Sequence, residues 1–590
     1  MVEDRQRRRY LGLLAAGAGT ALAGCSSITL PGTNDQRKID DWQYEPGETG
    51  DGGGGGLFGG VQMQSAGAQS AATADASVGL AAGGANDINT FRRNIEEGYL
   101  PQPESLSYEG LFYNYYFETG GEGGCSDLFC PSYSPAVTAD PLSGETERYL
   151  TVGLNSGLDA SSFERPPLNL VVVLDVSGSM SSSFSQYYYD RFGNRQTPEG
   201  DTSTPKIQVA REALVALTEQ LRPEDRLGVV LYSSESAVAK PLRPVEETDM
   251  DAIRGHIRED IQAGGGTNLD AGLSDATELL SAYRDAPASR ENRAIVLTDA
   301  MPNLGTTDDQ GLRDRLAENA VDGLHTTFVG VGVDFNAELV DELTSIRGAN
   351  YYSVHSTDEF RERMDDGFQY MVSPLVFDLS LELDAEGYEI RQVYGSSAAE
   401  ESTGEILRVN TLFASPTEDG RTRGGVVLAQ VERQSTDASM ELRATWENRA
   451  GTEQETTTTI TFPAESPEYF ANTGVRKAVL LSRYADLLKN WMIQERDETL
   501  APTADGIAVP PEERLGEWEQ QSQELSVGAE TAERIETFRA HFLAETEAIG
   551  DDSLGRELDE LDRILAAAPE ESEPEPEPET ETVIGNPPAQ

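Results

Sequence analysis

Lysine is the residue that this sequence most clearly lacks. Among 590 residues the lysines are Lys38, Lys206, Lys240, Lys477 and Lys489, so arginine supplies nearly all of the positive charge. The 45 basic residues are outnumbered by 103 acidic ones, which leaves a net charge of -58. A charge of this size repels nucleic acid and anionic lipid, which argues against both as partners. An acidic, lysine-poor surface is typical of proteins from concentrated salt, where screening weakens self-repulsion, and we interpret the chain as halophilic.

Cysteine and histidine are also scarce, with three and four residues. Cys125 and Cys130 lie close together, and in an exported protein the oxidised pair is the default interpretation. A zinc site would need two further ligands, and the histidines are scattered far from this pair in the sequence. We therefore predict a small disulfide clip between Cys125 and Cys130.

The first 25 residues are expected to be an export signal. Arg7–Leu11 has the order Arg-Arg-x-Tyr-Leu and precedes an apolar stretch that is too short to span a membrane as a mature helix. This order resembles a twin-arginine signal, and Leu22–Cys25 resembles a lipobox. Cleavage before Cys25 would leave this cysteine with a diacylglycerol, whose two chains anchor stably. No later apolar run is long enough to span a bilayer, so we predict a protein anchored through Cys25 at the outer face of the cell membrane.

The remaining length suggests several units. Residues 26–85 are rich in Gly, Ala and Ser and are expected to form a disordered tether, and residues 569–590 an acidic Pro/Glu tail. Residues 86–165 form an N-terminal flanking region with aromatic residues that suit a core. After residue 372 the apolar residues alternate with a period of two, which predicts a small antiparallel β domain over residues 373–465. Helical patterns return over residues 466–568.

Residues 166–372 alternate buried strands with amphipathic helices. The run Leu168–Leu174, which is apolar except for Asn169, predicts a strand that is covered on both faces. Further strands are expected at Leu227–Tyr232, Ala294–Thr298 and Thr327–Val333, and helices at Ile207–Leu221, Met250–Ile261 and Leu269–Tyr283. This alternation predicts an α/β fold with a doubly wound, mainly parallel sheet flanked by helices.

Oxygen-bearing side chains fall where three segments of this α/β region end. Asp175, Ser177 and Ser179 follow the first strand, Thr267 ends a glycine-rich loop, and Asp299 follows the strand at Ala294–Thr298. In an open parallel sheet, ligands bind at the edge where the strands have their carboxyl ends. Carboxylates and hydroxyls are hard donors that suit Mg²⁺, with Mn²⁺ and Ca²⁺ as alternatives. The sequence therefore predicts a divalent cation site.

The three motifs, in this order and context, resemble the metal-ion-dependent adhesion site of von Willebrand factor type A (VWA) domains. They read Asp-x-Ser-x-Ser, Gly-Gly-Thr-Asn-Leu and Leu-Thr-Asp. The resemblance implies that Ser177, Ser179 and Thr267 bind the metal directly. It also implies that Asp175 and Asp299 act largely through water, and that an acidic residue of a protein partner completes the coordination. Ala300 stands where the family often has glycine.

The flanks extend the resemblance. Asn89–Ile95, Gly98–Pro103 and Met371–Leu375 resemble the YfbK-type VWA lipoproteins of prokaryotes. The flanking regions of that group have no established chemistry, so the match indicates a family without indicating a task.

A long insertion separates Ser179 from the helix that begins near Lys206. It contains Tyr187, Tyr188 and Tyr189 among Ser, Asn and Gly, which are residue types that recognition loops favour. A surface insertion without a role is the alternative, since loops tolerate added length. We expect the loop to lie on the rim of the metal site and its tyrosines to select the partner.

Two other functions stay open from the sequence alone. A strand-end aspartate such as Asp175 could accept a phosphoryl group beside Mg²⁺, as in haloacid-dehalogenase phosphatases. Those enzymes need a second aspartate where Ser177 stands, no lysine lies near either motif, and no hydrolase triad has a placed histidine. A structural envelope component with a purely stabilising metal is the other alternative. We expect a surface-anchored binding protein that is not an enzyme.

Overall fold

The computed structural model describes residues 38–45, 77–85, 88–96, 98–120, 125, 127–161, 163–182, 188–189, 195–196, 204–284, 289–299, 309–331, 345–354, 367–396, 406–435, 439–462, 468–500 and 523–568. The predicted export signal, Cys25, the acidic tail and Tyr187 lie outside these residues. Within the insertion after Ser179, β8 (Tyr188–Tyr189) pairs antiparallel with β9 (Arg195–Gln196). No helix in the described ranges is long and apolar enough to cross a membrane.

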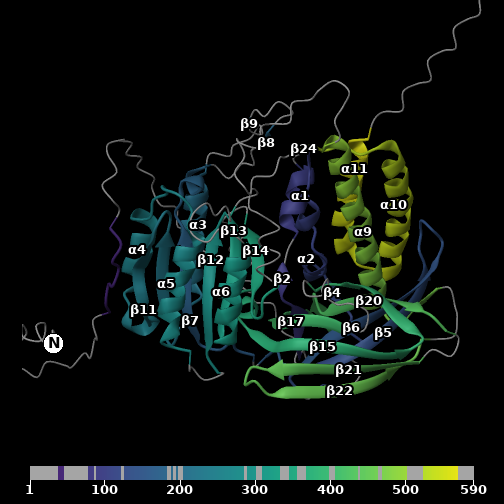
Figure 1. The fold of residues 1–590 in the computed structure, drawn as a ribbon, viewed down its shortest axis with the longest axis horizontal. Helices are drawn as coiled ribbons and strands as arrows, with labels where there is room; N and C mark the ends of the chain where they lie inside the picture. Colours follow the sequence, from purple (N-terminus) through teal and green to yellow (C-terminus); the bar gives the residue numbers. More distant parts are fainter. Residues whose placement is uncertain are drawn as a thin grey trace, which may run out of the picture. The chain divides into compact units, whose positions relative to one another are not determined.

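The apolar runs in the middle of the chain form the expected sheet, with the strand order β11-β10-β7-β12-β13-β14-β2 (Figure 1). β10 and β11 pair antiparallel, and the other neighbours pair in parallel. The strands are β2 (Gly84–Ala85), β7 (Leu168–Asp175), β10 (Arg226–Tyr232), β11 (Ser236–Pro244), β12 (Glu291–Thr298), β13 (Leu324–Val331) and β14 (Asn350–Val354). This arrangement confirms the predicted α/β fold with a mainly parallel sheet.

Helices cover both faces of this sheet, and each face has its own core. Leu170, Val172 and Leu174 of β7 pack in the core that contains α3 (Lys206–Glu219) and α4 (Met250–Glu259). Val171 and Val173 pack in the core that contains α5 (Leu269–Ser281) and α6 (Asp309–Val321). Because alternate residues of β7 enter two different cores, residues 170–174 are apolar without interruption.

The antiparallel sheet extends beyond residues 373–465. Its order is β16-β20-β6-β1-β17-β15-β21-β22, with β5 on β6 and β23 on β5, so strands from before and after the parallel sheet are combined. The strands are β1 (Ser77–Ala82), β5 (Cys130–Ala139), β6 (Thr146–Asp159), β15 (Pro374–Glu386), β16 (Tyr388–Tyr394), β17 (Ile406–Ser415), β20 (Val426–Arg433), β21 (Ser439–Asn448), β22 (Glu453–Ile460) and β23 (Tyr469–Phe470). The prediction of a separate, small β domain is therefore wrong about its extent.

The predicted tether is wrong for residues 77–85, which form β1 and β2. The small residues of β1 are needed for close packing rather than for flexibility. A Cβ atom added at Gly79 would lie 2.1 Å from Cγ2 of Thr422, so only glycine fits at this position. Composition alone does not distinguish such a strand from a linker.

Residues 38–45 form a second ordered piece of the predicted tether, at the edge of the parallel sheet. The Asp41 carboxylate lies 3.4 Å from Nζ of Lys240, whose side chain is fully buried. The Trp42 ring stacks on the ring of His256, with 5.5 Å between their centroids. This segment therefore supplies the counter-charge that a buried lysine requires.

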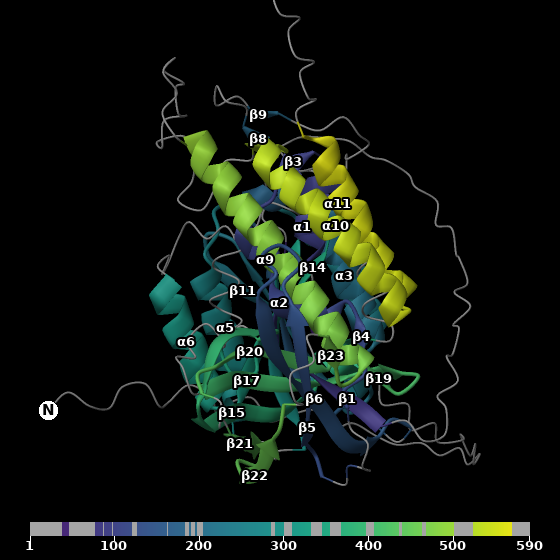
Figure 2. The ribbon, with the colours of Figure 1, turned by 90° about the vertical axis from the view of Figure 1, so that its right-hand side faces the viewer.

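The helices outside the parallel sheet share one core. They are α1 (Asn89–Glu96), α2 (Tyr108–Tyr113), α9 (Thr473–Leu500), α10 (Ala529–Ile549) and α11 (Gly555–Ala566). Figure 2 shows α10 beside α9, and α11 packs against α10 and α1. The short elements are β3 (Tyr99–Leu100), β4 (Tyr116–Phe117), β18 (Thr417–Glu418), β19 (Arg421–Arg423), β24 (Gln523–Glu524), η1 (Pro103–Ser105), η2 (Gly178–Ser181), η3 (Val245–Glu247) and η6 (Asp552–Leu554). The N-terminal flank and the C-terminal helical region thus fold together.

A disulfide joins Cys125 to Cys130, as the sequence suggested. Cys130 is the first residue of β5, and the carbonyl of Asp127 within the loop accepts a hydrogen bond from Gly157 N at 2.8 Å. The clip therefore closes a small loop against the end of β6.

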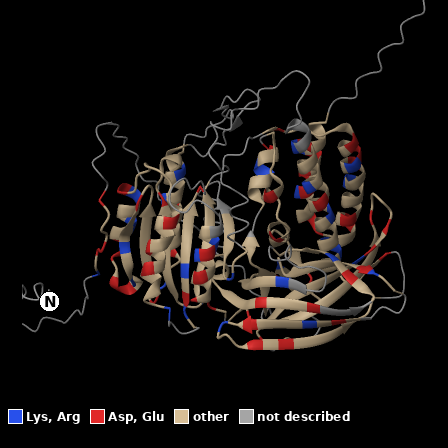
Figure 3. Ribbon diagram, viewed as in Figure 1, with Lys and Arg blue, Asp and Glu red and all other residues tan. Residues whose placement is uncertain are grey.

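Charged residues follow two patterns. Acidic residues lie on the helices and on the strands of both large sheets (Figure 3). Three of the rare lysines, Lys206, Lys240 and Lys477, are instead at most 2% exposed, and each lies against a carboxylate. Lysine serves in these places as a buried counter-charge.

Candidate metal centre

The turn after β7 brings two hydroxyls together. Asp175 ends β7, and its Oδ1 accepts a hydrogen bond from Ser177 N at 2.8 Å, which fixes the turn. The Oγ atoms of Ser177 and Ser179 are then 2.9 Å apart. Asp175 and Ser177 are fully buried, whereas Ser179 is partly exposed. The turn therefore presents its oxygens from the interior toward the carboxyl edge of the sheet.

The glycine-rich loop is fastened to this turn. Gly264 N donates to Val176 O at 2.7 Å, and Gly178 N donates to Gly265 O at 3.0 Å. Gly265 has φ of +91°, a conformation that residues with a Cβ rarely adopt. Thr267 follows two residues later and is 3% exposed. The loop thus holds the third predicted hydroxyl at the same edge.

Asp299 directly follows β12 and is fully buried. Its Oδ2 lies 3.3 Å from Nζ of Lys206, while its Oδ1 has no hydrogen-bond partner. A buried carboxylate oxygen without a donor or cation is costly, because it has lost its water and gained nothing in return. Oδ1 of Asp299 is therefore an oxygen that a cation or its bound water would satisfy.

Two further side chains hold Asp175 and were missed by sequence reasoning. Its Oδ2 accepts hydrogen bonds from Tyr232 Oη at 3.0 Å and Thr298 Oγ1 at 2.9 Å. Thr298 belongs to the Leu-Thr-Asp motif and Tyr232 ends β10, so their places at strand ends were the available signals. Burial, and then the charge of Asp299, raises the pKa of Asp175 to about 7.

Lys206 lies beside the candidate site. The sequence-based prediction that no lysine lies near the motifs is therefore wrong. Lys206 N donates to Ser182 O at 3.0 Å, so α3 begins where the metal turn ends. The long insertion separates the two in the sequence, but the packing of α3 beside β7 brings the Lys206 side chain back to Asp299.

The donor set fits a hard divalent cation. Mg²⁺ holds six ligands at about 2.1 Å in an octahedron, which places neighbouring ligand atoms about 3 Å apart. The 2.9 Å separation of the Ser177 and Ser179 hydroxyls agrees with such a pair. In the described part of the chain, no group of three or more His, Cys, Asp or Glu side chains could hold a metal. The hydroxyls of Ser177, Ser179 and Thr267 could complete a site at Asp175 and Asp299, and oxygen donors of this kind suit hard divalent cations rather than softer metals.

Mg²⁺ binding is expected to weaken as the pH falls below about 7, the pKa of Asp175. This pKa is raised above its ordinary value, so below it the folded, metal-free protein carries a proton that must leave before a cation binds. The affinity should then fall by up to about tenfold per pH unit. Calorimetric titration at several pH values, in two buffers that differ in ionisation enthalpy, measures both the affinity and the protons released. A constant affinity without proton release would contradict this expectation.

The sequence of this chain is similar to those of several known proteins. Residues 170–301 match the von Willebrand factor type A domain family. Human inter-alpha-trypsin inhibitor heavy chain H4 is 26% identical over 262 residues, which are 41% of this chain and 27% of that protein. The uncharacterized protein YfbK of Escherichia coli (strain K12) is 24% identical over 318 residues, which are 51% of this chain and 50% of that protein. The matched region thus spans half or less of these relatives.

Two solved structures are also similar. A von Willebrand factor type A protein from Catenulispora acidiphila has a TM-score of 0.40 at 15% identity, covering 63% of this chain and 82% of that one. An ArnB paralog from Sulfolobus acidocaldarius has a TM-score of 0.35 at 11% identity, covering 74% and 97%. Taken together, the mainly parallel sheet and the family match show that residues 170–301 contain a von Willebrand factor type A domain, in a chain that is similar to YfbK over about half of its length.

Proposed function

We propose that this protein captures a protein partner at the cell surface through a divalent cation held at the carboxyl edge of the parallel sheet. VWA domains generally mediate protein–protein interactions, often through a metal in this position. The observation that carries the proposal is the buried Oδ1 of Asp299, which has no partner, beside a turn with two hydroxyls 2.9 Å apart. Ser177, Ser179 and Thr267 would supply hydroxyl ligands, and Asp175 and Asp299 carboxylates.

A divalent cation, when bound, supplies a Lewis-acidic centre to which a partner's carboxylate can attach. The residues of this chain position and balance that centre. Tyr232 and Thr298 fix the Asp175 carboxylate, and the backbone contact between Gly178 and Gly265 keeps the two loops together. A site prepared in this way binds its ligand with little reorganisation.

Location and specificity belong to the same proposal. Export and lipid anchoring at Cys25 rest on the signal-like residues 1–25. The loop that leaves the metal turn carries Tyr187, Tyr188 and Tyr189, and we assign to these tyrosines the choice of partner. The metal would capture a carboxylate, and the tyrosines would select the protein that bears it.

Phosphoryl transfer is the competing function, because Lys206 does lie beside Asp299. The hydrogen bonds of Asp175 argue against it. Its Oδ1 accepts from Ser177 N, and its Oδ2 accepts from both Tyr232 and Thr298. A carboxylate whose two oxygens are both engaged is a poor nucleophile, and Ser177 stands where those enzymes have a second aspartate.

The test is affinity capture from envelope extracts with Mg²⁺ or a chelator. Wild-type protein should capture partners only with Mg²⁺, whereas Asp175→Ala and Ser179→Ala should lose capture, because each removes a proposed ligand. Ser181→Ala is the matched control. Ser181 lies in the same turn, and its Oγ only donates to Gly178 O at 2.6 Å, so its loss should leave capture unchanged.

Other outcomes would assign other functions. Capture that ignores the chelator would favour a structural role with a stabilising metal, and turnover of a phosphomonoester would favour the enzyme. Replacing Tyr187, Tyr188 and Tyr189 by serine should weaken capture while leaving the Mg²⁺ affinity unchanged. If the partners stay the same in kind and amount, specificity does not lie in this loop.

A further inference from the structure

The candidate metal centre contains a positive charge of its own. Nζ of Lys206 lies 3.3 Å from Oδ2 of Asp299, and the two side chains are 2% and 0% exposed. Salt screens exposed pairs strongly but buried pairs only weakly, so this charge persists even in concentrated salt. Any ligand that enters the site is therefore bound in the field of Lys206.

The formal charges show what Lys206 changes. With both carboxylates ionised, Asp175, Asp299 and Lys206 together carry one negative charge. A divalent cation turns the summed charge of these three groups into one positive charge. Without Lys206 the same loaded site would be neutral. A buried excess charge is unfavourable, and an anionic ligand removes it.

We propose that Lys206 is a specificity-determining residue that makes the metal-loaded site select a carboxylate over water or a neutral ligand. This inference rests on the proposed function. Lys206 repels the incoming cation, so the metal alone binds more weakly than two aspartates would permit. A carboxylate cancels the remaining charge, so cation and carboxylate bind cooperatively, each raising the affinity for the other by the same factor.

The geometry suits this role. Lys206 contacts Oδ2 of Asp299 and leaves Oδ1 without a hydrogen-bond partner, so the lysine balances charge without occupying the oxygen that a cation or its water could bind. An ammonium group is a compact point charge, whereas a guanidinium would tend to occupy both carboxylate oxygens at once. In a chain that otherwise uses arginine almost throughout, lysine stands at this position.

The experiment measures Mg²⁺ affinity by calorimetry in chloride and in acetate at equal ionic strength and pH above 7. For the wild type, acetate should raise the affinity severalfold. Lys206→Met should bind Mg²⁺ about tenfold or more tightly in chloride, because the repulsion is gone. It should also lose the effect of acetate. Lys206→Gln, which keeps a donor for Oδ2 but no charge, should behave likewise, and so provides a second variant if the methionine variant folds poorly.

Lys240→Met is the matched control. Lys240 is equally buried and lies 3.4 Å from Asp41, but at the edge strand β11. It should lower stability and leave both the Mg²⁺ affinity and the acetate effect as in the wild type. A full acetate effect in the Lys206 variants would overturn the role of Lys206 while leaving metal-dependent capture intact. Wild-type protein that binds Mg²⁺ without any response to acetate, or to an aspartate peptide compared with its asparagine counterpart, would overturn the proposed function itself.

Discussion

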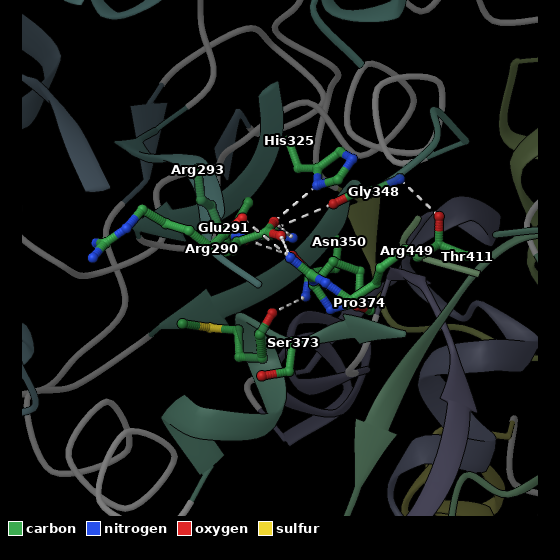
Figure 4. A network of polar contacts seen from close by, with 12 residues as sticks. Arg290, Glu291, Arg293, His325, Gly348, Asn350, Ser373, Pro374, Thr411 and Arg449 are labelled. Carbon is green, nitrogen blue, oxygen red and sulfur yellow. Dashed lines mark hydrogen bonds and ion pairs between the residues drawn. The ribbon is translucent and has the colours of Figure 1, made fainter. Parts of the chain in front are cut away.

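Replacing Glu291 by glutamine is expected to destabilise the protein by about 3–5 kcal/mol, as breaking a buried ion pair does. The Glu291 side chain is 1% exposed and accepts hydrogen bonds from Arg293 Nη2 and His325 Nδ1, both at 2.8 Å (Figure 4). Its Oε2 lies 2.9 Å from Nη2 of Arg449. Glutamine keeps the size of the side chain but leaves a fully buried Arg293 without its counter-charge.

This network connects the two large sheets. Glu291 begins β12, whose other end leads to Asp299. Arg449 comes from the turn between β21 and β22, and its Nη1 donates to Pro374 O, at the start of β15, at 2.8 Å. Losing Glu291 should therefore weaken the attachment of the antiparallel sheet to the end of the parallel sheet that lies opposite the metal centre.

The pH dependence of the free energy of unfolding tests the role of Glu291 independently. Burial alone would raise the pKa of Glu291, but the charges of His325, Arg293 and Arg449 outweigh it and lower the pKa to about 2. Since this value lies below the ordinary one, the group stabilises the fold above about pH 4.5 and loses this contribution as the pH falls toward 2. The contribution is roughly 3 kcal/mol. Glu291→Gln should lack this part of the acid sensitivity.

Urea unfolding in concentrated salt, followed by circular dichroism, measures these differences. Glu389→Gln on β16 is the control, because Glu389 is 48% exposed and lies 3.5 Å from an equally exposed Arg391. An exposed pair of this kind contributes at most about 1 kcal/mol. Equal effects of the two substitutions would show that burial of the network does not determine its contribution.

The same network explains why the start of β12 was predicted too late in the sequence. The apolar run predicted a strand from Ala294, but β12 begins at Glu291. Glu291 and Arg293 are buried although they are charged, because each neutralises the other. Hydropathy records the cost of burying each group and not the pairing that offsets it. The strand β7, whose apolar residues all enter one of the two cores, was predicted to within one residue.

At the candidate site, the residues in local motifs were predicted from the sequence, whereas those from distant elements were not. Asp175, Ser177, Ser179, Thr267 and Asp299 lie within short motifs at the ends of strands and in a glycine-rich loop, so local spacing was enough to single them out. Lys206 and Tyr232 contact the same carboxylates from α3 and β10. Contacts between side chains that are distant in the sequence leave no local pattern. The pairing of β1 with β6 and β17 was missed for the same reason.

Arg92→Met should lower the free energy of unfolding by about 3–5 kcal/mol, because it breaks a buried ion pair. This pair lies in the core that the N-terminal flank shares with the C-terminal helices. Arg92 of α1 forms an ion pair with Glu557 of α11, 465 residues away, and their side chains are 7% and 0% exposed. Tyr115 Oη also donates to Oε1 of Glu557 at 2.6 Å, whereas Oε2 has no hydrogen-bond partner. Removing the arginine leaves a buried carboxylate that has tyrosine hydroxyls beside it but has lost its positive partner.

The double variant Arg92→Met with Glu557→Leu should be more stable than Arg92→Met alone, because no uncompensated charge is left among the surrounding apolar side chains. A double-mutant cycle on urea unfolding should give a coupling free energy of about 2 kcal/mol or more. Arg539→Met is the matched control, since Arg539 pairs with Asp562 between α10 and α11, where the side chains are 34% and 51% exposed. It should change the free energy of unfolding by at most about 1 kcal/mol. Losses that simply add in the Arg92 and Glu557 variants would mean that each residue stabilises the helices through its own packing. The charge pair would then not be what holds α1 against α11.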